Sequence, residues 1–387
     1  MQKITRLAVA VATALAAAAA GAPSTAAAYG GAGGGDGDGH PRGGRHAVFV
    51  QTDNPSGNQI VAYRRADDGR LTPVGTYDTH GLGGVLGGSV ADHLASQGSL
   101  TYDPDHALLY AVNAGSDTVS VFSVDGDRLA LRQVVPSGGR FPVSITVHDD
   151  TVFVLNALNG GSIQGYTVRN GHLHQEAGWQ RPLGLDPNAT PQFTNTPGQV
   201  GFTGDGSQLV VTTKANGSSL LVFNLNRSGA PAATPVATSL PGAVPFAFVP
   251  NGRHGLFLAE AGTNAVATFT IHRDGTATQE AFAATGQAAT CWIVGVRDLL
   301  YASNAGSSTL TGLRTADRGR QLTVLGNTPT DPGTVDAAVS SNGHYLYAQT
   351  GINGILDEFA VNRDGSLTAL GSQTVPGAAG GEGIVAF

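Results

Sequence analysis

Residues 100–135 read LTYDPDHALLYAVNAGSDTVSVFSVDGDRLALRQVV, and this stretch decides the fold. Four short runs rich in β-branched, aromatic and aliphatic residues are separated by turn residues at 103–105, 113–116 and 125–126. Short runs bounded in this way are typical of strands joined by tight turns. The stretch therefore predicts one antiparallel, four-stranded meander.

The same unit recurs along the chain, and its last turn marks each copy. The turn glycines are Gly69, Gly126, Gly171, Gly229, Gly275, Gly319 and Gly365. Their successive spacings of 57, 45, 58, 46, 44 and 46 residues lie in the range of repeat arrays. A single meander leaves both faces of its sheet exposed to water, so the copies must stack on one another. Closing the stack into a ring leaves only short, protected sheet edges. The sequence predicts an all-β fold, a seven-bladed β-propeller of four-stranded antiparallel blades.

The two ends of the repeat region predict how the ring closes. The first unit starts at residues 46–50, which match the second strand of the other units, and no first strand precedes them. Residues 383–387 are left over after the last complete unit. We expect this C-terminal strand to be the innermost strand of blade one, within a propeller domain that covers residues 46–387.

The N-terminal region has the features of an export signal. Lys3 and Arg6 precede an apolar run over 7–20, and small residues lead to three alanines at 26–28. This order is typical of a signal peptide, which we place at 1–28. Residues 29–45 are mostly glycine and carry too little apolar surface to order themselves, so they predict a disordered leader. The expected location is secreted, outside the cell.

The net charge and the cysteine content limit the kinds of partner and cross-link that this chain can have. The chain has 21 basic and 28 acidic residues, for a net charge of −7. An acidic protein of this kind is expected to bind neither nucleic acid nor, after signal removal, a membrane. The one cysteine, Cys291, excludes an intrachain disulfide. We expect a monomer that binds a small molecule.

Neither a cofactor nor a metal ion is predicted. The glycine-rich stretch 81–87 lacks the third glycine of a dinucleotide-binding fingerprint, and no glycine-lysine pair forms a P-loop. The acidic stretch 36–40 lacks the closing acid of a calcium loop. His172 and His174 share one strand face, but no third ligand is apparent in the sequence.

Two stretches carry a family resemblance. Residues 110–122 (YAVNAGSDTVSVF) and 301–310 (YASNAGSSTL) resemble the lactonase-type seven-bladed propellers, which include 6-phosphogluconolactonases and carboxymuconate-lactonizing enzymes. The resemblance covers residues 46–387. Residues 96–99 (SQGS) and 286–292 (GQAATCW) are similar to the bacterial, often exported branch of that family.

The resemblance implies an exported, lactonase-like hydrolase. Separation from the cytoplasm and the lack of an arginine cluster in the sequence favour a small, unphosphorylated lactone as the substrate. Val143, Gly198 and Phe246 follow prolines where phosphogluconolactonase-like members tend to have histidine. This departure keeps a non-catalytic propeller, which binds a ligand or another protein, as the alternative.

The meander also predicts where a site would lie. Turns between the second and third strands share one face of a propeller with the links between blades, and both long insertions, 80–96 and 181–196, fall in such links. Long loops of this kind are often functional. We expect a polar funnel there. The candidate catalytic residues are Lys214 and Glu260, and the candidate ligand-binding residues are Gln97, Gln199, Gln287, Trp292, Asn304 and Asp336.

Each of these candidates has a purely structural alternative. Lys214 and Glu260 occupy matching places in adjacent blades, so they predict either an ion pair between blades or a lysine that binds a carbonyl beside a carboxylate base. The glutamines either bind ligand hydroxyls or satisfy backbone groups. Trp292 either stacks on a sugar ring or packs between blades, and Cys291 is either a buried core residue or a nucleophile.

Overall fold

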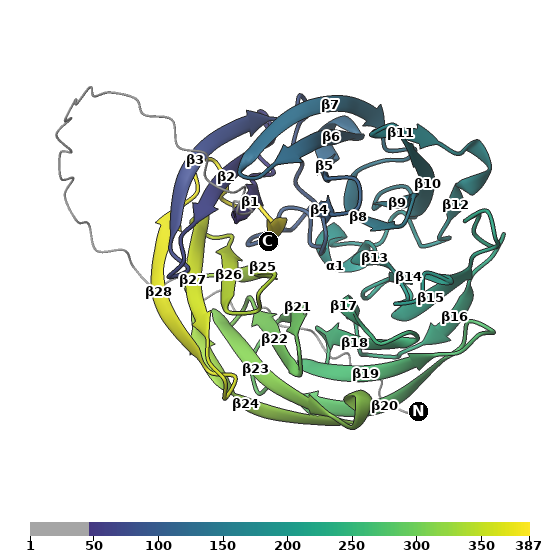
Figure 1. Ribbon diagram of the computed structural model, residues 1–387. Coiled ribbons are helices and arrows are strands. Elements are labelled where there is room, and N and C mark those ends of the chain that lie inside the picture. The colour runs from purple at the N-terminus through teal and green to yellow at the C-terminus, as the bar shows by residue number, and fades with distance from the viewer. Residues whose placement is uncertain (1–45) are drawn as a thin grey trace. The chain divides into compact units, whose positions relative to one another are not determined.

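The computed structural model describes residues 46–387, which form a ring of seven β-sheets around a central axis (Figure 1). The predicted signal peptide and leader lie outside the described residues. Each sheet is an antiparallel meander, and sheets follow one another around the ring in chain order. The predicted seven-bladed propeller is confirmed.

Each blade contributes one inner strand near the axis and one outer strand at the rim. Blade one contains β29 (Ile384–Ala386), β1 (Ala47–Gln51), β2 (Gln59–Arg65) and β3 (Leu71–Asp78), and blade two contains β4 (Leu100–Asp103), β5 (Leu108–Asn113), β6 (Thr118–Asp125) and β7 (Arg128–Pro136). Blade three contains β8 (Pro142–His148), β9 (Thr151–Asn156), β10 (Ser162–Arg169) and β11 (His172–Gln175), with the short β12 (Arg181–Pro182) also paired to β10. Blade four contains β13 (Gln199–Phe202), β14 (Gln208–Thr212), β15 (Ser219–Asn224) and β16 (Val236–Ser239), and blade five contains β17 (Pro245–Asn251), β18 (Gly255–Glu260), β19 (Ala265–Ile271) and β20 (Ala277–Ala284). Blade six contains β21 (Thr290–Val296), β22 (Leu299–Asn304), β23 (Thr309–Ala316) and β24 (Gln321–Pro329), and blade seven contains β25 (Thr334–Val339), β26 (Tyr345–Thr350), β27 (Ile355–Val361) and β28 (Leu367–Thr374).

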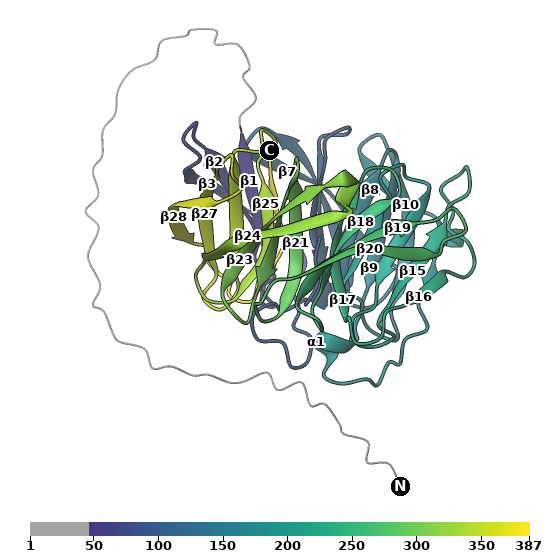
Figure 2. The same ribbon diagram turned by 90° about the horizontal axis from the view of Figure 1, so that it is seen from below.

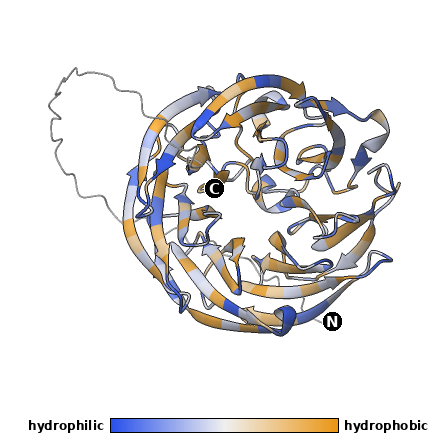
Figure 3. Cartoon of the chain, in the orientation of Figure 1, coloured by the Kyte–Doolittle hydropathy of each residue, from blue (hydrophilic) through white to orange (hydrophobic). Residues whose placement is uncertain are grey.

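Burial follows the position of a strand in its blade. Every residue of β5 is buried, because both faces of a second strand pack against neighbouring blades. The outer strand β7 is largely exposed, and covered residues alternate with exposed ones over 133–136, as expected for a strand with one face in water. Figure 3 shows this alternation of hydrophobic and hydrophilic residues along the outer strands. The core therefore lies between blades.

The turn glycines that mark the repeat also join neighbouring blades. Gly69 has φ +87° and Gly365 has φ +91°, a conformation that favours glycine. The Tyr347 hydroxyl of blade seven donates to the carbonyl of Gly69 at 2.7 Å, and the Tyr301 hydroxyl of blade six donates to the carbonyl of Gly365 at 3.0 Å. A Cβ atom on Gly69 would also lie 2.2 Å from the ring of Tyr345. These positions need glycine for both conformation and space.

The C-terminal strand closes the ring as the sequence predicts. β29 pairs antiparallel with β1, so that Phe49 faces Val385 and Val50 faces Ile384. The Gln51 amide donates to the carbonyl of Gly383 at 2.8 Å. The C-terminal segment is thus the inner strand of blade one, whose other three strands come from the start of the domain.

Deletion of residues 384–387 is expected to lower the free energy of unfolding by roughly 3 kcal/mol or more. Burial of one side chain of the size of Ile384 contributes about 1.5–3 kcal/mol, and each lost backbone hydrogen bond about 0.5–1.5 kcal/mol. Guanidinium denaturation followed by circular dichroism measures the loss. The control is Phe387→Ala, which removes the ring stacked on Tyr102 at 4.4 Å but keeps the strand. Equal stability of the truncated and full chains would contradict closure by β29.

Candidate functional site

The first insertion does not stay on the surface but passes into the ring. Residues 91–98, which we call the plug, lie between the blades at one end of the central channel. The Gln97 side chain exchanges two hydrogen bonds with the backbone of Ile293 in blade six, at 3.0 and 2.9 Å, although residue 97 leads into blade two. The backbone N–H of Gln97 also donates to the carbonyl of Gly198, at the start of blade four, at 3.1 Å. Only a segment at the axis reaches blades so far apart.

Further contacts tie the plug to most of the ring. The His93 amide donates to the carbonyl of Gly380, next to blade one, at 2.8 Å. The amide of Ile145 in blade three donates to the carbonyl of Gly98 at 2.8 Å. Gly351 of blade seven lies so close to Ala91 that a Cβ atom there would overlap the Ala91 carbonyl oxygen. The polar funnel that we expected is therefore filled by the insertion that we placed over it.

Lys214 lies beneath the plug and holds it. Its backbone has φ +51° in the turn after β14, and its side chain is 1% exposed. The Nζ atom donates to the carbonyls of Ala95 and Phe193 at 2.6 Å each, and to Thr196 Oγ1 at 3.2 Å. Burial lowers the pKa of the ammonium to about 7, against the opposing effect of nearby acidic groups, Asp92 first among them.

The predicted ion pair between Lys214 and Glu260 does not form in the described structure. The Glu260 carboxylate instead accepts a hydrogen bond from Thr263 Oγ1 at 2.8 Å, in the turn that follows its own strand. Burial raises the pKa of Glu260. The two residues share a face of the ring, but Lys214 is directed to the plug and Glu260 to its own blade. Their catalytic role stays a prediction.

The other candidate residues divide into two groups. Gln97, Trp292 and Asp336 meet at the plug, where the Trp292 indole N–H donates to the carbonyl of Ser96. Gln199 lines the channel, and its Oε1 accepts from the Phe248 amide at 2.6 Å. Gln287 and Asn304 are instead engaged within blade six, the first with Thr309 and the second with Thr290, Thr309 and Thr311.

Sequence reasoning named Asp336 but missed that it belongs to a cluster of carboxyl groups in and beneath the plug. Asp53, Asp92, Asp336 and Glu382 are all buried there, each at most 5% exposed. The Glu382 amide donates to Asp53 Oδ2 at 2.8 Å, and Ser96 Oγ donates to Glu382 Oε1 at 2.7 Å. The four residues are distant in sequence, so no spacing motif could reveal them. Among the described residues, no group of three or more His, Cys, Asp or Glu side chains is arranged to hold a metal ion.

Burial controls the protonation of this cluster. It raises the pKa of Asp53 to about 8, of Asp336 to about 7 and of Asp92 to about 6. The pKa of Glu382 is raised well above its usual value by burial and by the three neighbouring carboxylates. Burial also raises the pKa of the nearby Cys291 thiol to about 12. The cluster therefore holds protons near neutral pH, and Cys291 is a buried, protonated thiol.

Below the plug the channel widens into the axial cavity, about 380 Å³ in volume. Its walls come from the inner strands of blades two to five, and it reaches the turns at 104, 204 and 250 on the face opposite the plug. Figure 2 shows α1 (Gln192–Asn195), which belongs to the plug face, and the C-terminus at opposite ends of the ring. The lining residues are Gly98, Thr101, Tyr102, Pro104, Ile145, Thr146, Val147, His148, Gln199, Val200, Gly201, Phe202, Thr203, Gly204, Phe248 and Pro250.

His148 is the imidazole of the axial cavity, and sequence reasoning missed it too. It ends β8, its Nδ1 lies 3.4 Å from Asp149 Oδ2, and its ring packs on Phe202 with centroids 5.4 Å apart. The side chain is 35% exposed, so solvent reaches it. The available signal was a histidine at the last position of an inner strand.

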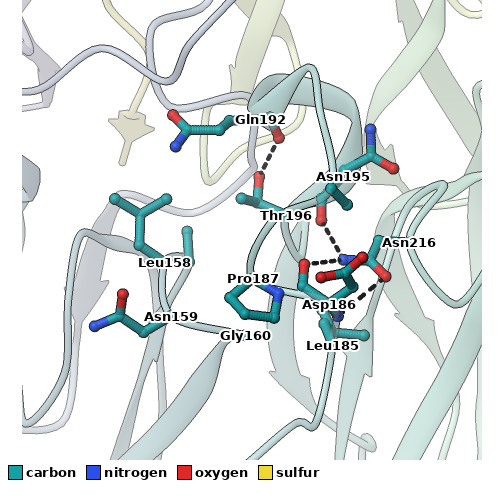
Figure 4. Close-up of a pocket in the computed structure, with 12 residues that line it drawn as sticks. Leu158, Asn159, Gly160, Leu185, Asp186, Pro187, Gln192, Asn195, Thr196 and Asn216 are labelled. Carbon is teal, nitrogen blue, oxygen red and sulfur yellow. Dashed lines mark hydrogen bonds between the residues drawn. The ribbon is translucent and has the colours of Figure 1, made fainter.

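The second insertion forms a tight pocket rather than a ligand site. It lies between blades three and four and is lined by residues that include Asn159, Asp186 and Asn195. Figure 4 shows Asn216 in contact with Asp186 and Asn195, and its Nδ2 donates to their carbonyls at 2.9 and 3.0 Å. The enclosed volume is about 10 Å³, close to the space that one water molecule needs.

A family model for the seven-bladed β-propeller lactonases matches residues 86–381, so the chain belongs to that family. No curated protein sequence matches the chain. Among solved structures, a 6-phosphogluconolactonase candidate from Bacteroides fragilis has 18% identity and a TM-score of 0.71, with 90% of this chain and 100% of that chain covered.

A second similar structure is the periplasmic gluconolactonase of Pseudomonas aeruginosa. It has 18% identity and a TM-score of 0.70, with 88% of this chain and 98% of that chain covered. At this identity the likeness shows the fold alone. In residues 46–387, no helix is long and apolar enough to span a bilayer.

The buried carboxyl groups predict how stability depends on pH. A group whose pKa is raised by folding stabilises the folded state below its unfolded pKa, and that contribution is lost as pH rises through the folded value. For Asp53, Asp92 and Asp336 the loss falls between about pH 4 and pH 8. The pKa of Lys214 is lowered to about 7, so its contribution to the free energy of unfolding rises with pH instead of falling. This rise begins only near pH 7.

We expect the free energy of unfolding to fall between pH 5 and pH 7. Glu382→Gln should reduce this fall by roughly 1 kcal/mol or more, since one pKa unit corresponds to about 1.4 kcal/mol and the variant removes one buried acid that also repels its neighbours. Guanidinium titrations at both pH values measure the effect. The control Asp67→Asn removes an exposed carboxylate and should leave the fall unchanged. Parallel pH profiles for Glu382→Gln and the wild type would contradict the assignment.

Proposed function

We propose that this propeller hydrolyses a small, unphosphorylated lactone in the axial cavity. One observation carries the proposal: a cavity of about 380 Å³ at the ring axis is lined by threonine hydroxyls, a glutamine amide, a phenol and one imidazole. This size and this mixture of apolar and polar groups are typical of small-molecule sites. Membership of the lactonase propeller family supports the choice of reaction.

The absence of positive charge in the cavity supports an unphosphorylated substrate. None of the residues that line it is a lysine or an arginine, which are the side chains that usually bind phosphate. Lys214 is sealed beneath the plug and is already engaged with two carbonyls. A neutral, hydroxylated lactone fits such a lining, because Tyr102 and Thr146 offer hydroxyl partners and the aromatic rings offer apolar surface.

In this proposal His148 is the general base. A neutral imidazole takes a proton from water as the water oxygen adds to the lactone carbonyl. The tetrahedral intermediate then collapses, the ring C–O bond breaks, and the imidazolium returns its proton to the leaving alkoxide. The product is the open hydroxy acid. Asp149, whose carboxylate lies 3.4 Å from Nδ1, would stabilise the imidazolium.

The test uses a panel of unphosphorylated sugar lactones and their 6-phosphorylated counterparts. Hydrolysis of each lactone is measured by the release of acid at constant pH. We expect higher kcat/KM for the unphosphorylated member of each pair. His148→Asn should lower kcat by roughly 10²–10⁴-fold. The matched control is His174→Asn, which changes an exposed histidine in the outer strand of the same blade and should retain full activity.

The same panel separates this assignment from the sequence-based one. If Lys214 and Glu260 are the catalytic pair, Lys214→Met and Glu260→Gln will reduce turnover and His148→Asn will not. If the chain is a binding propeller, saturable lactone binding will appear without turnover above background. Preference for phosphorylated lactones would overturn the proposed substrate class.

We also propose that the protein is exported and acts outside the cytoplasm. The support is the order of basic, apolar and small residues over 1–28. N-terminal sequencing of protein recovered from culture medium should find a mature end near Tyr29. Recovery of chains that still begin at Met1 would contradict export with signal removal.

A further inference from the structure

The plug is held by groups that can gain or lose charge. Ser96 Oγ donates to Glu382 Oε1 at 2.7 Å, and the Lys214 ammonium donates to the carbonyl of Ala95 at 2.6 Å. Inside the plug, Asp92 accepts from the amides of Leu94 and Ser96 at 2.8 and 3.0 Å. Loss or gain of a proton at these positions therefore acts directly on the segment that closes the channel.

The charges beneath the plug do not balance when all groups are ionised. Four carboxylates then face one ammonium, in a region closed to water. Glu382 is 0% exposed, and its Oε2 has no hydrogen-bond partner among the described residues. An ionised carboxylate in that position lacks compensation, which is strongly unfavourable in a dry interior.

Several elements around the cluster contribute a titratable group. Asp53 follows β1, Asp336 lies in β25, Cys291 lies in β21 and Lys214 follows β14. The plug itself supplies Asp92 and His93, whose buried Nδ1 also lacks a partner among the described residues. Of the two basic groups named here, Lys214 supplies the ammonium, and burial lowers the pKa of His93.

We propose that the plug is a proton-controlled stopper, closed while the carboxyl groups beneath it are protonated and loosened when they ionise. In the closed state it seals the axial channel at the plug face. In the loosened state water reaches the cluster, and the channel opens at both ends. This proposal does not rest on lactone hydrolysis.

The charges of the cluster determine in which direction a change of pH shifts the plug between its closed and loosened states. As pH rises from 6 to 8, Asp92, Asp336 and Asp53 pass through their raised pKa values of about 6, 7 and 8. Lys214 acts in the opposite direction above its lowered pKa of about 7, because its buried ammonium then becomes neutral and no longer favours hydration. The three carboxyl groups outnumber it, so negative charge still accumulates in the cluster as pH rises. Mutual repulsion and the gain in hydration both favour opening at alkaline pH.

Cys291 is a built-in reporter of this opening. It is the single cysteine of the chain, it is 8% exposed, and Ala91 of the plug packs against the hydrophobic cluster that contains it. Its neighbour Trp292 donates its indole N–H to the carbonyl of Ser96. A reagent in solution reaches this thiol only when the plug moves away or the domain unfolds.

The experiment measures the reaction of Cys291 with 4,4′-dithiodipyridine in the full chain between pH 5 and pH 9. Each rate is divided by the rate for the same chain unfolded in guanidinium at the same pH, which removes the intrinsic titration of the thiol. We expect this ratio to rise roughly tenfold or more from pH 6 to pH 9. The rise should depend little on low guanidinium concentrations, since local opening exposes little surface.

Two variants test the cause, with one control. Glu382→Gln should flatten the pH dependence, because it keeps the shape of the protonated acid and cannot ionise. Ser96→Ala removes the hydroxyl that joins the plug to Glu382 and should raise the ratio at every pH. Asp67→Asn should behave as the wild type. A ratio independent of pH, an unchanged profile for Glu382→Gln, or labelling only at the rate of global unfolding would each overturn the proposal.

Discussion

The pairing of β29 with β1 is the constraint on which the rest of this structure depends. It joins the two ends of the domain into blade one and leaves no inner strand missing from the ring. The residues just before β29 also bind the plug at the axis, because Gly380 and Glu382 accept hydrogen bonds from it. Closure of the ring and closure of the channel therefore use one segment, and a change in either is expected to affect the other.

The plug replaces an open funnel with a sealed, charged interior. Its backbone meets most blades, so it ties the ring together across the axis. This arrangement has a cost, because carboxyl groups and an ammonium that are removed from water must stay neutral or be compensated. Protons at the carboxyl groups and carbonyl partners at Lys214 meet that demand near neutral pH. A neutral polar core at the axis is stable, whereas a fully ionised one is not.

The two ends of the channel consequently differ in chemistry. The plug face holds titratable groups that solvent does not reach, and the opposite face leads to the axial cavity, where His148 is accessible. We therefore propose small-molecule chemistry for the open cavity and sensitivity to pH for the closed end. Gly98 lies at the end of the plug and also lines the cavity, so it connects the two.

The architecture was determined by the sequence itself, because the turn glycines, the alternating runs and the unmatched first and last strands are local patterns that define seven meanders and their closure. The number of blades, the order of strands and turns within each blade, and the role of residues 383–387 could all be predicted. The site could be predicted only in part: Gln97, Trp292, Lys214 and Asp336 do meet, but Lys214 turns to the plug and not to Glu260. Only the tertiary structure decided that the insertion at 80–96 enters the ring, and that Asp53, Asp92, Asp336 and Glu382 become neighbours. The physical reason is that a ring brings the same end of every blade to one axis, so residues up to 329 positions apart bond there without any shared spacing in the chain.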